Sequence, residues 1–204
     1  MSTFARTIAA ACTAFDADVA LIDVGPNLGS LNRAVLLGCD NVVVPLGADL
    51  FSLQGLRNMG PALREWQGAW RRNRDQNPDP ALLLPQGIMA PAGYVVMRHS
   101  VTAGRPAKAF SKWIAKIPAQ YREYVLNDKT PAANAVESDP SCLTVLKDYR
   151  SLMPMAQEAR KPMFKLGPAD GAFGGHQAAV QSCGQDFRKL TLSILDVCGV
   201  SVPV

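Results

Sequence analysis

Hydrophobic residues near the start of the chain recur first at helical and then at strand-like spacing. Steps of four, four and three residues predict an amphipathic helix whose apolar face consists of Phe4, Ile8, Cys12 and Phe15. Residues 19–24 form a β-prone run that does not alternate with polar positions. Such a run is typical of a strand buried on both faces of a parallel sheet, and Gly25 ends it.

Helix and strand patterns continue to alternate after this run. Residues 30–39 have helical spacing, and residues 41–46 form a second apolar run. The strand–helix–strand order predicts a βαβ unit.

The middle of the chain repeats the alternation with longer elements. A helix is predicted from Ser52, as its N-cap, toward Arg74. Residues 77–91 contain four prolines and are predicted to form a loop, which leads into a third strand at residues 94–97. Pro106 is expected to open another helix.

The last helix has the most regular periodicity. Its apolar positions step by three, four, three and four residues and are Val180, Cys183, Phe187, Leu190 and Ile194. We expect this face to pack on the sheet. The chain is therefore predicted to have an α/β fold with a mainly parallel sheet flanked by helices, forming a single domain over residues 1–204 with a helical or loop insertion around residues 106–142.

Composition is compatible with one soluble globular domain. The chain has 204 residues, 48% of them hydrophobic, and a net charge of +4, which is too low for a dedicated nucleic-acid binder. Five cysteines without a C-x-x-C pair favour a reducing compartment, so we expect a cytoplasmic location. No run approaches the ~20 apolar residues that span a bilayer, so no membrane partner is expected.

Asp23 is the first candidate for chemistry. It comes at the end of a predicted parallel strand, where α/β proteins build their ligand sites. A carboxylate at this place can hold Mg²⁺, or a water bound to it, beside a phosphate. The alternative is that Asp23 is only a turn or helix-capping residue.

The sequence around Asp23 resembles a known family. Residues 22–29 read I-D-V-G-P-N-L-G and resemble the I-D-T-P-P-S-L-G motif of ParA/MinD-type ATPases. Residues 40–46 and 49–56 resemble D-E-V-I-I-P-V and E-Y-F-A-L-E-G-L of that family at the same relative offset. Residues 158–164 resemble its S-F-G-K-P-V-F segment. The chain is thus similar to the C-terminal portion of a P-loop ATPase domain of this kind.

The resemblance implies roles for the residues of the first motif. Asp23 would assist Mg²⁺ binding, and Pro26 and Gly29 would shape the nucleotide-switch loop. Gly25 stands where the family has its first proline, and Val24 replaces a threonine, so the loop differs in stiffness and in hydroxyl contacts.

A second difference concerns base recognition. Relatives place an asparagine before an arginine in V-V-N-R, whereas this chain has Met97 before Arg98. Arg98 therefore remains a candidate nucleotide contact, with altered recognition of adenine.

The phosphate-binding loop is missing from the sequence. Such a loop needs a glycine-rich turn followed by lysine, and the chain has no Gly-Lys dipeptide. The chain is expected to be either a fragment or a variant that has discarded hydrolysis, and we favour the fragment. A complete relative would bind Mg²⁺ and ATP and hydrolyse ATP, but we assign no catalytic residue here and expect no ATPase activity from this chain alone.

Basic residues offer a second kind of site. ParA relatives bind DNA nonspecifically, which makes candidate contacts of Arg71, Arg72, Arg74, Lys161 and Lys165. The alternative, which we favour for the arginines, is that Trp66 and Trp70 pack inward while the arginines solvate the helix end.

Three hypotheses for function follow. The first is an ATP-dependent partition or positioning switch that forms a homodimer, binds DNA and responds to a ParB-like stimulating partner, as the resemblance implies. The second is a noncatalytic interaction module of the same fold. The third is a metabolic ATP-dependent synthase of the same superfamily, although no residue indicates a substrate.

Overall fold

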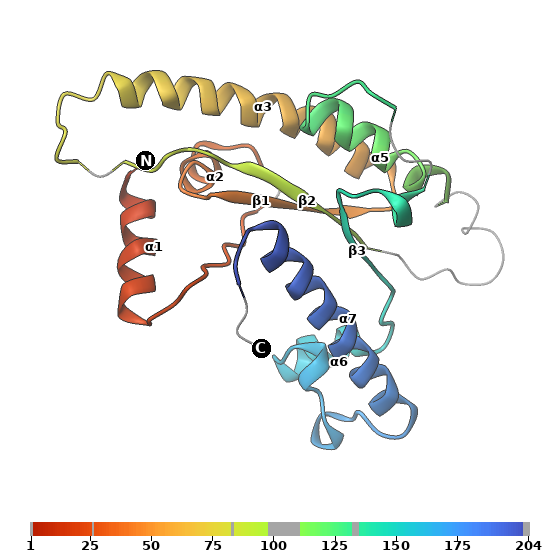
Figure 1. Ribbon diagram of the computed structural model, residues 1–204. Helices are drawn as coiled ribbons and strands as arrows, with labels where there is room; N and C mark the ends of the chain where they lie inside the picture. Colours follow the sequence, from red (N-terminus) through yellow and green to blue (C-terminus); the bar gives the residue numbers. More distant parts are fainter. Residues whose placement is uncertain (1, 26, 83, 98–110, 132–134, 202–204) are drawn as a thin grey trace. The chain divides into compact units, whose positions relative to one another are not determined.

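The computed structural model describes residues 2–25, 27–82, 84–97, 111–131 and 135–201 (Figure 1). The chain divides into two compact units. The first comprises residues 1–42, 54–91 and 120–131, and the second comprises residues 43–53, 92–119 and 132–204.

The first unit is mainly helical. It contains α1 (Ser2–Ala14), α2 (Ser30–Leu36), most of α3 (Leu50–Asp75) and the π-helix η1 (Tyr121–Val125), which α5 (Ile117–Gln120) directly precedes. The helices predicted from the periodicity of residues 4–15, 30–39 and 52–74 are therefore confirmed. α1 packs against α2, and Leu37 at the end of α2 is fully buried.

α3 approaches η1 closely at one glycine. A Cβ added to Gly60 would overlap the carbonyl oxygen of Tyr124, so only glycine permits this approach. Arg64 Nη1 donates hydrogen bonds to the carbonyl oxygens of Tyr124, at 2.6 Å, and Val125, at 3.3 Å. Arg57 lies over the Tyr124 ring, 5.5 Å from its centroid. These contacts occupy the backbone acceptors at the end of η1.

The second unit contains almost all of the sheet. The strands β1 (Asn41–Gly47), β2 (Ala90–Met97) and β3 (Cys142–Leu146) are arranged in the order β1-β2-β3. β2 and β3 are parallel, with Tyr94 opposite Cys142 and Met97 opposite Leu146. The predicted α/β fold with a parallel sheet flanked by helices is confirmed.

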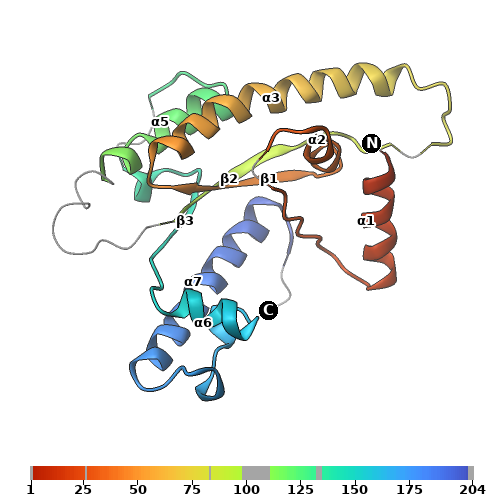
Figure 2. The same ribbon diagram turned by 180° about the vertical axis from the view of Figure 1, so that it is seen from behind.

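Short and long helices flank β3 in the chain of the second unit. η2 (Val136–Ser138) precedes the strand, and α6 (Leu152–Ala159), η3 (Met163–Lys165), η4 (Pro168–Asp170) and α7 (Gly175–Val197) follow it. α7 lies beside β3 in both views (Figures 1 and 2). Its predicted apolar face does pack on the sheet, because Phe187, Leu190 and Ile194 contact a cluster of Val95, Leu143 and Leu146.

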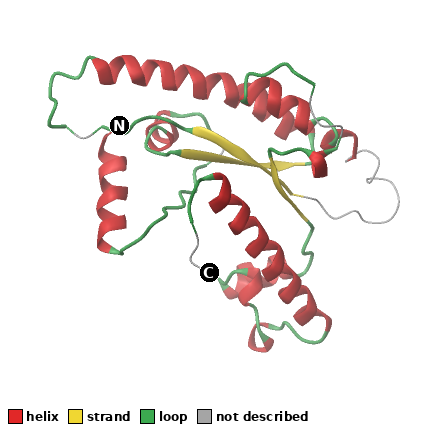
Figure 3. Cartoon of the chain, viewed as in Figure 1, coloured by secondary structure: helices red, strands yellow, loops and turns green. Residues whose placement is uncertain are grey.

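The predicted strand over residues 19–24 is wrong. Residues 17–25 and 27–29 are loop (Figure 3), and no described segment pairs with them as a strand. The Leu21 side chain is 84% exposed and Val19 is 40% exposed. A continuous apolar run becomes a buried strand only when other segments cover its faces and edges, and the described residues supply no such cover here.

Several smaller differences separate the structure from the sequence patterns. β3 was not predicted, because five residues are too few for a periodic signal. α3 begins at Leu50 rather than at Ser52, because the Asp49 carboxylate accepts a hydrogen bond from the Ser52 N–H at 2.7 Å. Phe15 is exposed despite its place on the predicted apolar face of α1.

Two other expectations are not settled by these residues. The start of the helix expected at Pro106 lies outside the described residues, and the assignment to one domain with an insertion stays a prediction. Within the described part of the chain, no helix is both long enough and apolar enough to cross a membrane.

Candidate functional site

The loop between α1 and α2 contains the acidic residue singled out by sequence. Asp23 lies in this loop with an exposed side chain, not at the tip of a buried strand as predicted. The difference follows from the missing strand: without neighbouring strands, the backbone around Asp23 remains open to solvent. Its carboxylate therefore reaches solvent freely, but the sheet does not orient it.

The part of the loop next to α2 is held in place by Asn32. The Nδ2 group of this buried residue donates hydrogen bonds to the carbonyl oxygens of Gly25, at 2.7 Å, and Asn27, at 2.8 Å. The Asn27 side chain in turn accepts a hydrogen bond from the Gly29 N–H at 3.0 Å. Residues 25 and 27–29, the turn before α2, are therefore tied to the first turn of that helix.

Gly29 has a steric reason to be glycine. It is the N-cap of α2 in an extended conformation that any residue adopts, but an added Cβ would lie 2.9 Å from Asn27 Oδ1. A side chain at this position would displace the Asn27 amide. The other two predicted contacts, Pro26 and Arg98, lie outside the described residues.

A magnesium ion at Asp23 would need ligands from elsewhere. In the described ranges, no three side chains of His, Cys, Asp or Glu gather into a cluster. Mg²⁺ commonly keeps several waters and binds through one or two carboxylates together with substrate phosphates. Asp23 is a single exposed carboxylate, so phosphate oxygens and water would have to supply the remaining ligands of such an ion.

Sequence reasoning missed Asn32 and its neighbour Arg33. An asparagine within an amphipathic helix does not by itself indicate a structural role. The two carbonyl oxygens that Asn32 binds lie five and seven residues away in an irregular loop, so no sequence pattern marks them. Arg33 lies over Trp66 at 5.9 Å from the ring centroid, and its Nε is buried without a hydrogen-bond partner among the described residues. The guanidinium is thus held by the ring rather than by an acid.

The basic residues on α3 do not form one uniform patch. Trp66 and Trp70 are each only 7% exposed, so the prediction that the tryptophans pack inward is confirmed. Arg74 donates hydrogen bonds to the backbone and side chain of Gln86, whereas Arg71 and Arg72 are exposed. α3 therefore presents two arginines without an ion pair to any described residue.

The two lysines of the second unit differ in the same way. Lys161 Nζ forms an ion pair with the Asp170 carboxylate at 2.7 Å, and this contact together with the Gly167 N–H lowers the pKa of Asp170. Lys165 is exposed and has no ion pair within the described part. Only Lys165 is therefore available to an anion without the loss of an existing contact.

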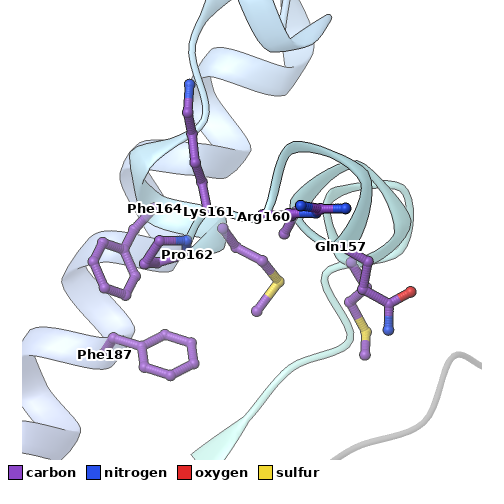
Figure 4. A pocket seen from close by; sticks show the side chains of 9 residues that line it. Gln157, Arg160, Lys161, Pro162, Phe164 and Phe187 are labelled. Carbon is purple, nitrogen blue, oxygen red and sulfur yellow. The ribbon is translucent and has the colours of Figure 1, made fainter.

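An apolar groove in the second unit was also missed by the sequence reasoning. It has a volume of about 440 Å³ and lies where α6, η3 and α7 meet (Figure 4). Phe164 and Phe187 line one side of it, with their ring centroids 5.6 Å apart, while the Lys161 side chain points away. This lining suits apolar groups rather than phosphates.

Comparisons with known proteins relate part of the chain to a family. Residues 4–75 match a family model described as an AAA domain. No curated protein matches the chain. A crystal structure of a protein from Corynebacterium diphtheriae is similar over 93% of this chain and 54% of its own length, with 17% sequence identity and a TM-score of 0.48. The chain thus spans about half the length of that neighbour.

The matched region contains the candidate loop. Residues 4–75 include Asp23, the turn before α2 and Asn32. The family match supports a P-loop ATPase-type domain in coarse terms, with general use of nucleotide and Mg²⁺. Over these residues the chain is similar to ATPases of the P-loop type.

Proposed function

We propose that the chain provides the acidic residue and the switch loop of an ATP-dependent partition or positioning protein of the ParA/MinD kind. The observation that carries this proposal is the juxtaposition of the exposed Asp23 carboxylate with a turn whose backbone Asn32 fixes. The match of residues 4–75 to a P-loop ATPase-type family supports it.

Each residue of the loop would have a distinct task. Asp23 would accept hydrogen bonds from waters on a nucleotide-bound Mg²⁺, and the ion would neutralise phosphate charge. Asn32 would hold the turn in one conformation, because its amide occupies two carbonyl oxygens on either side of Pro26. Gly29 would leave room for the Asn27 amide beside the α2 N-terminus. A change in this turn would then report the presence of the nucleotide to α2.

Calorimetric titration of the full gene product with ATP tests the proposal. With Mg²⁺ present, Asp23→Asn should weaken ATP binding by about tenfold or more, the effect of losing a hydrogen bond to a charged group. Asp18→Asn is the matched control, because it removes the same charge from the same exposed loop. If both variants bind Mg-ATP as tightly as the parent protein, Asp23 has no part in the site.

The finer parts of the proposal need separate assays. A homodimer that forms with Mg-ATP should appear in sedimentation velocity as a nucleotide-dependent increase in mass. Nonspecific DNA binding should weaken as salt rises, because counterions compete for each phosphate contact. A ParB-like partner should increase ATP turnover. A protein that binds Mg-ATP but shows none of these responses would be an ATPase of another kind.

A further inference from the structure

A hollow lies between α3 and the loop that precedes β2, and no residue of the switch loop lines it. Its volume is about 270 Å³, and it belongs entirely to the first unit. The side chains of α3 that line it are spaced by four and three residues and therefore share one face of the helix. The lining consists of Gln67, Arg71, Arg74, Gln86, Gly87 and Ile88.

Hydrogen bonds from α3 fix the loop that closes the hollow. Trp70 Nε1 donates to the Pro85 carbonyl oxygen at 2.8 Å. Gln67 Nε2 donates to the carbonyl oxygen of Ile88. Arg74 Nη1 donates to the carbonyl oxygen of Gln86, at 3.3 Å, and also to its side-chain oxygen. Three side chains of one helix thus hold this short stretch of backbone at residues 85, 86 and 88.

Gly87 makes this arrangement possible. Its φ of +71° is in the left-handed region that favours glycine, and an added Cβ would overlap the Trp70 indole ring. Gly87 itself is buried. The loop can therefore lie directly on α3 and form a preformed wall.

The charged side chains that line the hollow are two arginines. None of the described residues that line it is acidic. Arg74 is hydrogen-bonded only to neutral groups, and Arg71 has no hydrogen bond or ion pair to any residue in the described ranges. A guanidinium group presents a planar fork of donors that suits oxyanions such as phosphate.

We infer that this hollow binds a phosphate group, with Arg71 as its main contact and Arg74 as a second cationic wall. The group is carried by free phosphate or a phosphomonoester, or by the backbone of a nucleic acid. The site does not depend on the proposed ATPase function, because it shares no residue with the switch loop.

Titration with inorganic phosphate, followed by ³¹P line broadening and calorimetry, tests the inference. Arg71→Gln should weaken binding by about tenfold to a hundredfold, as expected when a charge-assisted hydrogen bond is lost. Arg6→Gln is the matched control, because Arg6 is an exposed arginine of the same unit and does not line the hollow. It should leave the affinity within about twofold.

A DNA duplex titrated in parallel separates the two sources of phosphate. Saturable binding of phosphate that depends on Arg71 supports a phosphomonoester site. Binding of the duplex that depends on Arg71 more than on Arg6, with no response to phosphate alone, supports a backbone contact. Equal effects of the two variants in both titrations, or no binding in either, would overturn the inference. Gly87→Ala provides a check on geometry, since displacement of the loop should lower the affinity while Arg71 is still present.

Discussion

Replacement of Asn32 by alanine should release the loop that contains the candidate site. The single Nδ2 group makes both hydrogen bonds that fix the turn, at 2.7 and 2.8 Å, and the side chain is only 8% exposed. Each such bond contributes roughly 0.5–1.5 kcal/mol net, so the variant should lose about 1–3 kcal/mol of local stability. The carbonyl oxygens of Gly25 and Asn27 would then accept hydrogen bonds from water instead.

Hydrogen exchange measured by mass spectrometry reads this loss directly. The hydrogen-bonded amides of Gly29 and Arg33 should exchange about 5-fold to 140-fold faster in Asn32→Ala, which is the stated energy expressed as a ratio of opening constants. Asn58→Ala is the control, because Asn58 is exposed on α3 and its side chain accepts a hydrogen bond from Gln54 of the same helix. Unchanged exchange in Asn32→Ala would refute the idea that this side chain organises the turn, and with it the structural basis of the proposed switch.

Three further predictions concern the second unit. Tyr94→Phe should lower the free energy of unfolding in urea by about 1.5–3 kcal/mol, because the buried hydroxyl donates a hydrogen bond to the Asp139 carboxylate at 2.6 Å. A decrease below about 0.5 kcal/mol would mean that water replaces the hydroxyl. Phe187→Ala should lower the free energy of unfolding by about 3 kcal/mol, the lower end of the range for buried phenylalanines, because this half-buried ring packs against two apolar clusters. A decrease near zero would show that the clusters do not depend on the ring. Burial, together with the charges of Asp139 and Glu137, raises the pKa of Cys142 from 9.0 to about 11. The unfolded chain therefore loses the thiol proton at a lower pH than the folded chain does. The free energy of unfolding should keep its full contribution from this group below pH 9 and decrease between pH 9 and 11. Cys142→Ala should remove that part of the pH dependence in unfolding curves, and an unchanged slope would assign it to other groups.

The sequence located most helices and two strands of the sheet, because these elements carry a local repeat. The face of α7 that steps by three and four residues could pack only on an apolar surface, and it contacts β2 and β3 residues as expected. Residues 41–46 likewise predicted β1 within one residue. β3 escaped detection because it is short and is defined by its pairing with β2, which begins 52 residues earlier at Ala90 and ends at Met97.

The candidate site shows where local patterns stop being sufficient. The sequence by itself determined that an acid follows an apolar run and precedes a glycine-containing turn and a helix. Whether that run forms a strand depends on neighbours that cover it, and in this structure Leu21 is exposed and Asp23 lies in a loop.

Only the tertiary structure decided which polar residues hold the functional loops. Asn32 reaches back to Gly25, and Trp70 reaches Pro85, across separations that no periodic pattern encodes. The physical reason is that a helix or a strand repeats its own geometry along the chain, whereas a hydrogen bond to an irregular backbone exists only once folding has placed both partners within about 3 Å of each other.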